Sequence, residues 1–187
     1  MTDTPQVATR LTVEEFMALP ETLFPTELID GEVIVSPAPK DPHQKSSTYL
    51  LGWLVQNAPD GELRHQPTDL HLNGHVLQPD IFWVSAGNQH CTLGDDGYWY
   101  GPPDLVIEIL SPSTMLRDRG IKYEIYEQAG VREYWLVDTE AAFFEVYVRE
   151  GEGFRRFGVF GLDQTFQSPV LNGQAVAVGA ILGQESK

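Results

Sequence analysis

Two acidic residues stand in stretches of the chain that are otherwise apolar. Asp80 directly precedes Ile81-Phe82-Trp83, and Glu108 lies inside the run from Asp104 to Leu110. Burying a carboxylate without a partner is costly, so something must compensate each of them. At about 4 Å two carboxylates repel by roughly 4 kcal/mol at an effective dielectric of about 20. A divalent cation turns that repulsion into binding, and oxygen ligands suit magnesium or manganese.

Each carboxylate also has a plainer explanation, which is an arginine partner or a position in water at the end of a strand. A basic segment that follows Glu108 favours a shared site. Arg117, Arg119 and Lys122 are three of the twelve basic residues and fall within six positions. Lys122 shares a helical stripe with Asp118, at i, i+4 spacing, and is expected at the edge of the buried face, within reach of the sheet. The alternative for Lys122 is a solvated lysine paired with Asp118.

The elements around the two carboxylates are expected to be strands and hairpins. Asp-Gly and Asn-Gly between apolar runs are strong hairpin signals. They predict one hairpin over Glu27–Val35, turning at Asp30-Gly31, and a second that turns at Asn73-Gly74. The return strand of the second hairpin is expected from Val76 to Val84, and it contains Asp80. The mostly apolar run 104–110 is typical of a central strand covered on both faces.

Helices are expected on either side of these strands. Asp41 to Ala58 has apolar residues at helical spacing, and Ser113 is expected to cap a helix that runs to Ala129. Further predicted elements are a capping box at Thr12 and Glu15, a strand over Tyr134–Val137, and a closing meander over 142–148 and 154–160. This order predicts an α/β fold, a mixed central β-sheet flanked by helices, in one domain over residues 1–187.

Composition limits the setting and the partners. With 187 residues and 42% hydrophobic content, the chain can bury a full core. A single cysteine, Cys91, and the absence of an apolar run in residues 1–12 point to the cytoplasm, and no stretch is long enough to span a membrane. The net charge of −15 repels phosphate backbones. A nucleic-acid-binding face must therefore be positive locally, through the basic segment with Lys40 and Lys45, or through a metal.

Two histidine groups are not expected to bind zinc. A two-residue turn at Asn73-Gly74 puts His71 and His75 on opposite faces of their hairpin, and His90 with Cys91 lacks two further ligands. The excursion Gly87–Gly101 carries an aromatic cluster, Tyr98 to Tyr100, which is expected to be exposed and to form a subunit contact through Trp99.

Several segments together resemble the Uma-two family of restriction endonucleases, within the PD-(D/E)XK nuclease superfamily. The resemblance covers about residues 11–148, with residues 149–187 as a C-terminal meander and tail. Its most specific parts are Pro-Asp-Leu-Val-Ile-Glu-Ile-Leu-Ser-Pro-Ser and Glu-Tyr-Trp-Leu-Val-Asp. The matching segments are Glu27–Glu32, His43, Gln78–Asp80, Pro103–Thr114, Lys122 and Gly130–Asp138.

The resemblance implies a restriction-endonuclease-like core and roles for individual residues. Asp80 stands where the superfamily has its metal-binding aspartate, and Glu108 matches the (D/E) position. The superfamily's lysine would follow two residues later, but that position is Leu110. In the Uma-two pattern the lysine has moved to the next helix, which points to Lys122.

Three further positions take part by resemblance. The backbone carbonyl of Ile109 would complete the ligands of a Mg²⁺ or Mn²⁺ ion. Glu27 matches an acidic position that often completes such sites, and His43 matches a recurrent histidine with no assigned role.

The expected function is magnesium-dependent endonuclease activity on DNA, with catalytic residues Asp80, Glu108, Lys122 and Glu27. Cleaving both strands of a duplex with one site per chain calls for two chains, so a homodimer or larger homo-oligomer is expected. The main alternative is a non-catalytic, self-associating or protein-binding relative of the nuclease fold, which the acidity and Leu110 favour. A third reading is hydrolysis of a smaller phosphodiester.

Overall fold

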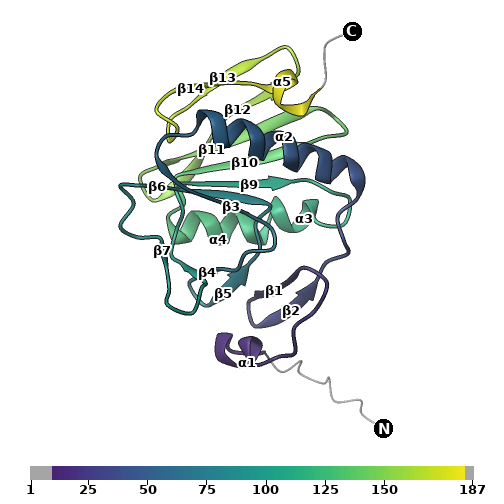
Figure 1. The fold of residues 1–187 in the computed structure, drawn as a ribbon, viewed down its shortest axis with the longest axis vertical. Helices are drawn as coiled ribbons and strands as arrows, with labels where there is room; N and C mark the ends of the chain where they lie inside the picture. Colours follow the sequence, from purple (N-terminus) through teal and green to yellow (C-terminus); the bar gives the residue numbers. More distant parts are fainter. Residues whose placement is uncertain (1–9, 184–187) are drawn as a thin grey trace.

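The protein is built on a six-stranded mixed sheet with the strand order β12-β11-β10-β9-β6-β3. The computed structural model describes residues 10–183. Strands β9 and β10 are parallel, and every other neighbouring pair in this sheet is antiparallel. The predicted mixed α/β fold is therefore confirmed (Figure 1). The strands are β3 (Gly61–His65), β6 (Ile81–Ser85), β9 (Leu105–Ile109), β10 (Glu133–Asp138), β11 (Phe143–Glu150) and β12 (Gly153–Gly161).

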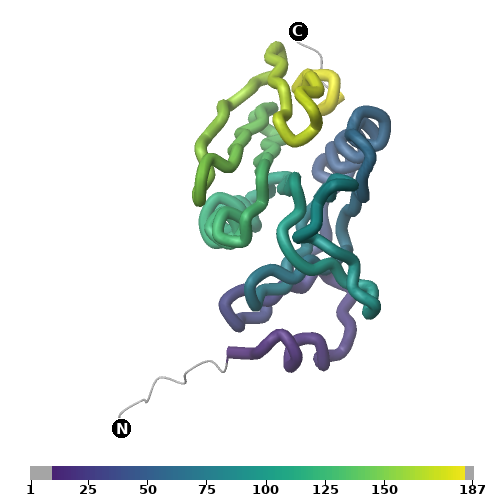
Figure 2. The backbone as a smooth tube through the Cα atoms, turned by 90° about the vertical axis from the view of Figure 1, so that its left-hand side faces the viewer, coloured from purple at the N-terminus to yellow at the C-terminus, as the bar shows by residue number. Residues whose placement is uncertain are grey.

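Strand β9 lies inside this sheet, and all five of its residues are buried. Leu105, Ile107 and Ile109 face one hydrophobic cluster, whereas Val106 and Leu110 face another. Helix α2 (Asp41–Asn57) packs on the first face and helix α4 (Ile121–Ala129) on the second. The two helices lie on opposite sides of the sheet, α2 in blue and α4 in green (Figure 2). The central run is thus covered on both faces, as predicted.

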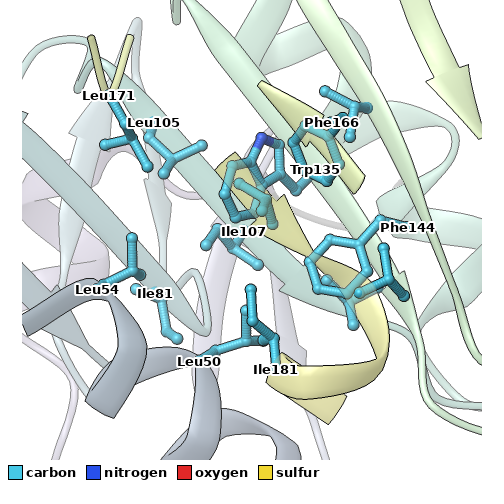
Figure 3. Close-up of a cluster of buried hydrophobic side chains, with 14 of the residues drawn as sticks. Leu50, Leu54, Ile81, Leu105, Ile107, Trp135, Phe144, Phe166, Leu171 and Ile181 are labelled. Carbon is cyan, nitrogen blue, oxygen red and sulfur yellow. The ribbon is translucent and has the colours of Figure 1, made fainter. Parts of the chain in front are cut away.

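The C-terminal part of the chain completes the first cluster. Strands β13 (Thr165–Ser168) and β14 (Gln174–Ala177) form a separate hairpin that leads into α5 (Val178–Leu182). Phe166 and Ile181 from this part pack with Trp135 of β10 (Figure 3). Residues beyond the meander therefore contribute to the core of the protein.

A second sheet has the order β2-β1-β5-β4-β8-β7. Both predicted hairpin turns occur in it, with positive φ angles at Asp30-Gly31 and at Asn73-Gly74, as such turns require. His71 pairs with Val76 across the second turn, the register predicted for that hairpin. The strands are β1 (Thr26–Ile29), β2 (Glu32–Val35), β4 (Leu70–Leu72), β5 (His75–Leu77), β7 (Thr92–Leu93) and β8 (Trp99–Tyr100).

The predicted return strand from Val76 to Val84 is wrong, because it is two strands in two different sheets. Strand β5 ends at Leu77 and β6 begins at Ile81. Pro79 has no N–H for a ladder, and the N–H of Gln78 bonds instead to Glu27 Oε1 at 2.9 Å. The link 78–80 carries the chain between the sheets and leaves Asp80 at the start of β6.

The predicted helix from Ser113 to Ala129 is also divided. It consists of α3 (Met115–Asp118) and α4, separated at Gly120, whose φ of −113° and ψ of −105° are not helical. Thr114, not Ser113, occupies the N-cap position of α3. Gly130, with φ of 98°, ends α4 as predicted. The basic side chains on either side of this break have different partners: Arg117 bonds to Ser36, Arg119 to Glu145 and Lys122 to Glu108.

The expected exposure of Trp99 is wrong, whereas a subunit contact through Tyr98 to Tyr100 stays a prediction. Trp99 is 5% exposed and packs edge-on against Phe82 of β6, with ring centroids 5.8 Å apart. Its burial closes the second cluster over the end of the main sheet. Tyr100 is exposed, and its hydroxyl donates to Asp96.

Two smaller features complete the fold. The predicted capping box forms, with Thr12 and Glu15 each accepting a hydrogen bond from the other's backbone at the start of α1 (Val13–Met17). None of the helices within residues 10–183 is long and apolar enough to cross a bilayer.

Candidate active site

A cavity of about 350 Å³ lies where the two sheets meet α2, α3 and α4. Its inner wall carries five charged side chains from different elements, and none of them is more than 6% exposed. These side chains are Glu27, Asp80, Glu108, Asp118 and Lys122. Four carboxylates and one ammonium are therefore enclosed together.

Asp80 and Glu108 are brought together by the antiparallel pairing of β6 and β9. Ile81 pairs with Ile107, so the residue before β6 lies beside the end of β9. Asp80 Oδ2 accepts the backbone N–H of Ile109 at 2.7 Å, which fixes the carboxylate against that strand. Both carboxylates line the cavity, as expected for residues that share an ion.

Lys122 reaches the carboxylates from α4. Its Nζ lies 2.8 Å from Glu108 Oε1 and 2.9 Å from Glu27 Oε1. Asp118 Oδ1, one helical turn earlier, is 3.8 Å away. The lysine is 4% exposed, so the reading of a solvated surface lysine is wrong. It occupies the inside of the site and bridges both sheets.

Tyr126 is a further member of the site that reasoning from sequence did not assign. Its hydroxyl donates to Glu108 Oε1 at 2.7 Å, and the ring is fully buried. Lys122 and Tyr126 therefore hold the same oxygen of Glu108.

His43, in the first turn of α2, lies at the other carboxylate. Its Nε2 is 3.2 Å from Asp80 Oδ2. Burial lowers the pKa of His43, but the hydrogen bond to Asp80 and the charges of Asp80 and Asp118 outweigh burial and raise it above its usual value. The protonated form of His43 is thus favoured by the acidic surroundings.

The cavity encloses four carboxyl groups beside the lysine ammonium. Burial raises the pKa of Glu108 well above its usual value, and burial also raises the pKa of Asp118 to about 6. For Lys122 burial acts to lower the pKa, but Glu108, Glu27 and Asp118 outweigh it and hold that pKa well above normal. Lys122 is therefore charged at neutral pH, and a cation bound at Glu108 would offset the burial that disfavours the charged form of this carboxyl group.

The donors in the cavity fit magnesium or manganese. Asp80 and Glu108 supply carboxylate oxygens. Ile109 follows Glu108 on β9 and donates its N–H to Asp80, and its carbonyl is the third donor that the family resemblance implies. No three His, Cys, Asp or Glu side chains within residues 10–183 come together as a dedicated metal-binding group. Magnesium usually binds through one or two carboxylates and keeps water and phosphate ligands. Two carboxylates and one carbonyl as protein ligands are consistent with this mode of magnesium binding.

Comparison with known proteins identifies the family. The model of a family described as "Uma2: Putative restriction endonuclease" matches residues 13–179. The chain belongs to the Uma2 family. A solved structure, described as a "putative nuclease belonging to DUF820" from Anabaena variabilis, has a TM-score of 0.74 and 21% sequence identity. The match covers 92% of this chain and 98% of that one, and it shows a shared fold. No curated protein matches the chain.

Five of the residues singled out through the Uma-two resemblance line this cavity, namely Glu27, His43, Asp80, Glu108 and Lys122, whereas Ile109 does not line it. Asp118 and Tyr126 were not assigned to the site from sequence, although their i, i+4 spacing with Lys122 was the signal that could have placed them there. Arg119 belongs elsewhere, because its guanidinium pairs with Glu145 of β11.

Proposed function

We propose that this Uma2 protein is a magnesium-dependent endonuclease that hydrolyses phosphodiester bonds of DNA. The observation that supports it most is the meeting of Asp80, Glu108 and Lys122 in one cavity, with the lysine ammonium 2.8 Å from Glu108 Oε1. The resemblance to the nuclease superfamily implies an acidic pair with a lysine, and these three residues supply that set.

Asp80, Glu108 and the backbone carbonyl of Ile109 would hold the ion. When bound, Mg²⁺ or Mn²⁺ lowers the pKa of a water and neutralises charge that develops on the phosphate. The protein's own groups prepare the ligands, since the Ile109 N–H orients Asp80 and Tyr126 orients Glu108.

Lys122 takes the place of the strand lysine. The position two residues after Glu108 is Leu110, which is buried in a hydrophobic cluster. Lys122 approaches the same carboxylate from α4 and remains charged, so it would stabilise negative charge on the phosphate or orient the attacking water. Glu27 holds this ammonium from the opposite side, at 2.9 Å.

A plasmid-nicking assay at low salt with manganese tests the proposal. Asp80→Asn and Glu108→Gln keep the side-chain shapes and remove the charges, so both should abolish nicking and weaken manganese binding in calorimetry. Nicking that persists in both variants would indicate a contaminating nuclease. An inactive wild-type protein that also fails to bind manganese would favour the non-catalytic relative of the fold.

We also propose that the nuclease works as a homodimer in the cytoplasm. Two sites related by a two-fold axis would match the symmetry of duplex DNA, and the single buried cysteine fits a reducing compartment. Sedimentation at micromolar concentration checks the assembly, and a strict monomer would contradict it.

A further inference from the structure

Arg117 of α3 is a part-buried cation whose charge has no acidic partner. Its Nη2 donates to Ser36 Oγ at 2.8 Å, across from the segment that follows β2. Within residues 10–183 it forms no ion pair, and its buried Nε has no hydrogen-bond partner. Buried polar atoms are nearly always paired, so an open donor on a guanidinium requires an explanation. In a chain with 27 acidic residues, an unpaired arginine is more unexpected still.

The neighbouring basic residues do not share this property. Arg119 pairs with Glu145, and Lys122 is held by Glu27 and Glu108 inside the cavity. Of the three basic residues in this segment, Arg117 alone keeps a charge that a ligand could use.

Arg117 does not itself line the cavity, but it donates a hydrogen bond to a residue that does. Its partner Ser36 lines the cavity, as does the exposed Lys40 a few residues later. On the α3 side the lining carries the hydroxyls of Ser111 and Thr114, which lie 3.0 Å apart. The mouth therefore combines cations with hydroxyl groups, whereas the interior is acidic.

We propose that Arg117, with Ser36 and Lys40, forms a phosphate-binding subsite at the cavity mouth. This inference rests on the proposed function, because the subsite would bind a backbone phosphate that neighbours the one to be cleaved. A guanidinium presents a planar set of donors that matches phosphate oxygens, and no acidic side chain within residues 10–183 forms an ion pair with Arg117. The subsite would supply local positive charge in a chain whose net charge of −15 repels phosphate.

The test compares Arg117→Met with Arg119→Met, which removes the same charge two residues away. Binding of a fluorescent single-stranded oligonucleotide is measured by anisotropy with EDTA present, so that no metal contributes, over a series of low salt concentrations. Arg117→Met should weaken binding about tenfold, the effect of one charge-assisted contact. Its log–log salt slope should fall in magnitude by about 0.7, the value for one phosphate of a single strand.

Arg119→Met should bind within about twofold of the wild type, because its charge is already neutralised by Glu145. Arg117→Lys keeps the charge and loses the planar donors, so it should retain most of the salt slope while binding more weakly than the wild type. It also serves if Arg117→Met does not fold.

Equal losses of oligonucleotide affinity in Arg117→Met and Arg119→Met would overturn the subsite. Wild-type affinity in Arg117→Met or in Arg117→Lys would also overturn it. So would a wild-type protein that binds no oligonucleotide at low salt. The nuclease proposal is tested separately, by cleavage of bis(4-nitrophenyl) phosphate by the wild-type protein with manganese. Absence of cleavage would count against the nuclease proposal and leave the subsite test unaffected. That small diester has no neighbouring phosphate, so its hydrolysis does not depend on the subsite.

Discussion

Lys122 Nζ lies 2.8 Å from Glu108 Oε1, although the two residues come from a helix and a strand separated by a loop and a helix break. Lys122 is the one buried lysine within residues 10–183, and it shares the cavity with four buried carboxylates. Its contribution to stability and its contribution to catalysis are therefore linked.

Replacing Lys122 by methionine should destabilise the protein as well as abolish nicking. Removing one partner of a buried ion pair typically costs about 3–5 kcal/mol, because it leaves an uncompensated charge. We expect a loss in this range at neutral pH in urea unfolding. Glu108→Gln in the same chain should recover part of it, since the remaining buried charge falls. A Lys122→Met protein as stable as the wild type would contradict the buried ion pair.

Tyr126→Phe should weaken manganese binding without abolishing it. The change removes the hydroxyl that holds Glu108 Oε1, a hydrogen bond worth about 1 kcal/mol, and leaves Lys122 as the remaining donor. Tyr134→Phe is a matched control, because the Tyr134 hydroxyl donates to the Asp118 carbonyl at 2.9 Å. Both variants should lose similar stability, and calorimetry should show weaker metal binding only in Tyr126→Phe.

Manganese should raise the thermal unfolding midpoint of the wild type. A ligand that binds only the folded state stabilises it by mass action, by about 2.7 kcal/mol at a hundredfold excess over Kd. Asp80→Asn should remove this shift. Glu133→Gln should keep it, because Glu133 is a buried carboxylate that bonds to Trp135 and Ser168, in a different core. Equal shifts in all three proteins would place the ion outside the cavity.

Asp104 should stabilise the folded protein at neutral pH and lose that contribution in acid. Burial alone would raise the pKa of Asp104, but hydrogen bonds from the Ser85 backbone, Arg132 and Asn88 outweigh it and lower the pKa. A carboxyl with a lowered folded-state pKa stabilises the fold above its unfolded pKa of about 3.9 and loses that contribution as pH falls. Asp104→Asn should therefore be less stable than the wild type at neutral pH.

The difference in stability between the wild type and Asp104→Asn should narrow as the pH falls below about 4, where the Asp104 carboxyl of the wild type takes up a proton. Urea unfolding midpoints of both proteins, measured across this pH range, give this difference directly. A constant gap at every pH would mean that the loss comes from packing.

Local chemistry accounts for what could be predicted from the sequence. The Asp30-Gly31 and Asn73-Gly74 turns need positive φ, and these residue pairs provide it, so hairpin positions and register followed. The alternation of side chains along β9 placed Glu108 on the face that α4 covers. The spacing along α4 then brought Lys122 toward it.

The parts that could not be predicted depend on contacts distant in sequence. The chain leaves the second sheet at Gln78 because Glu27, from a different hairpin, accepts its N–H. Trp99 is buried because Phe82 of the main sheet lies beneath it. The helix breaks at Gly120, where the sequence pattern favoured one continuous helix.

Glu27 is bonded to Lys122 of α4 and to the backbone of Gln78 in the link between sheets. One side chain from the first hairpin thus completes a site whose other members come from much later in the chain. The active groups are correctly arranged only after both sheets have docked. In the proposed nuclease, a partly unfolded copy would therefore lack an assembled site and would be unable to cleave DNA.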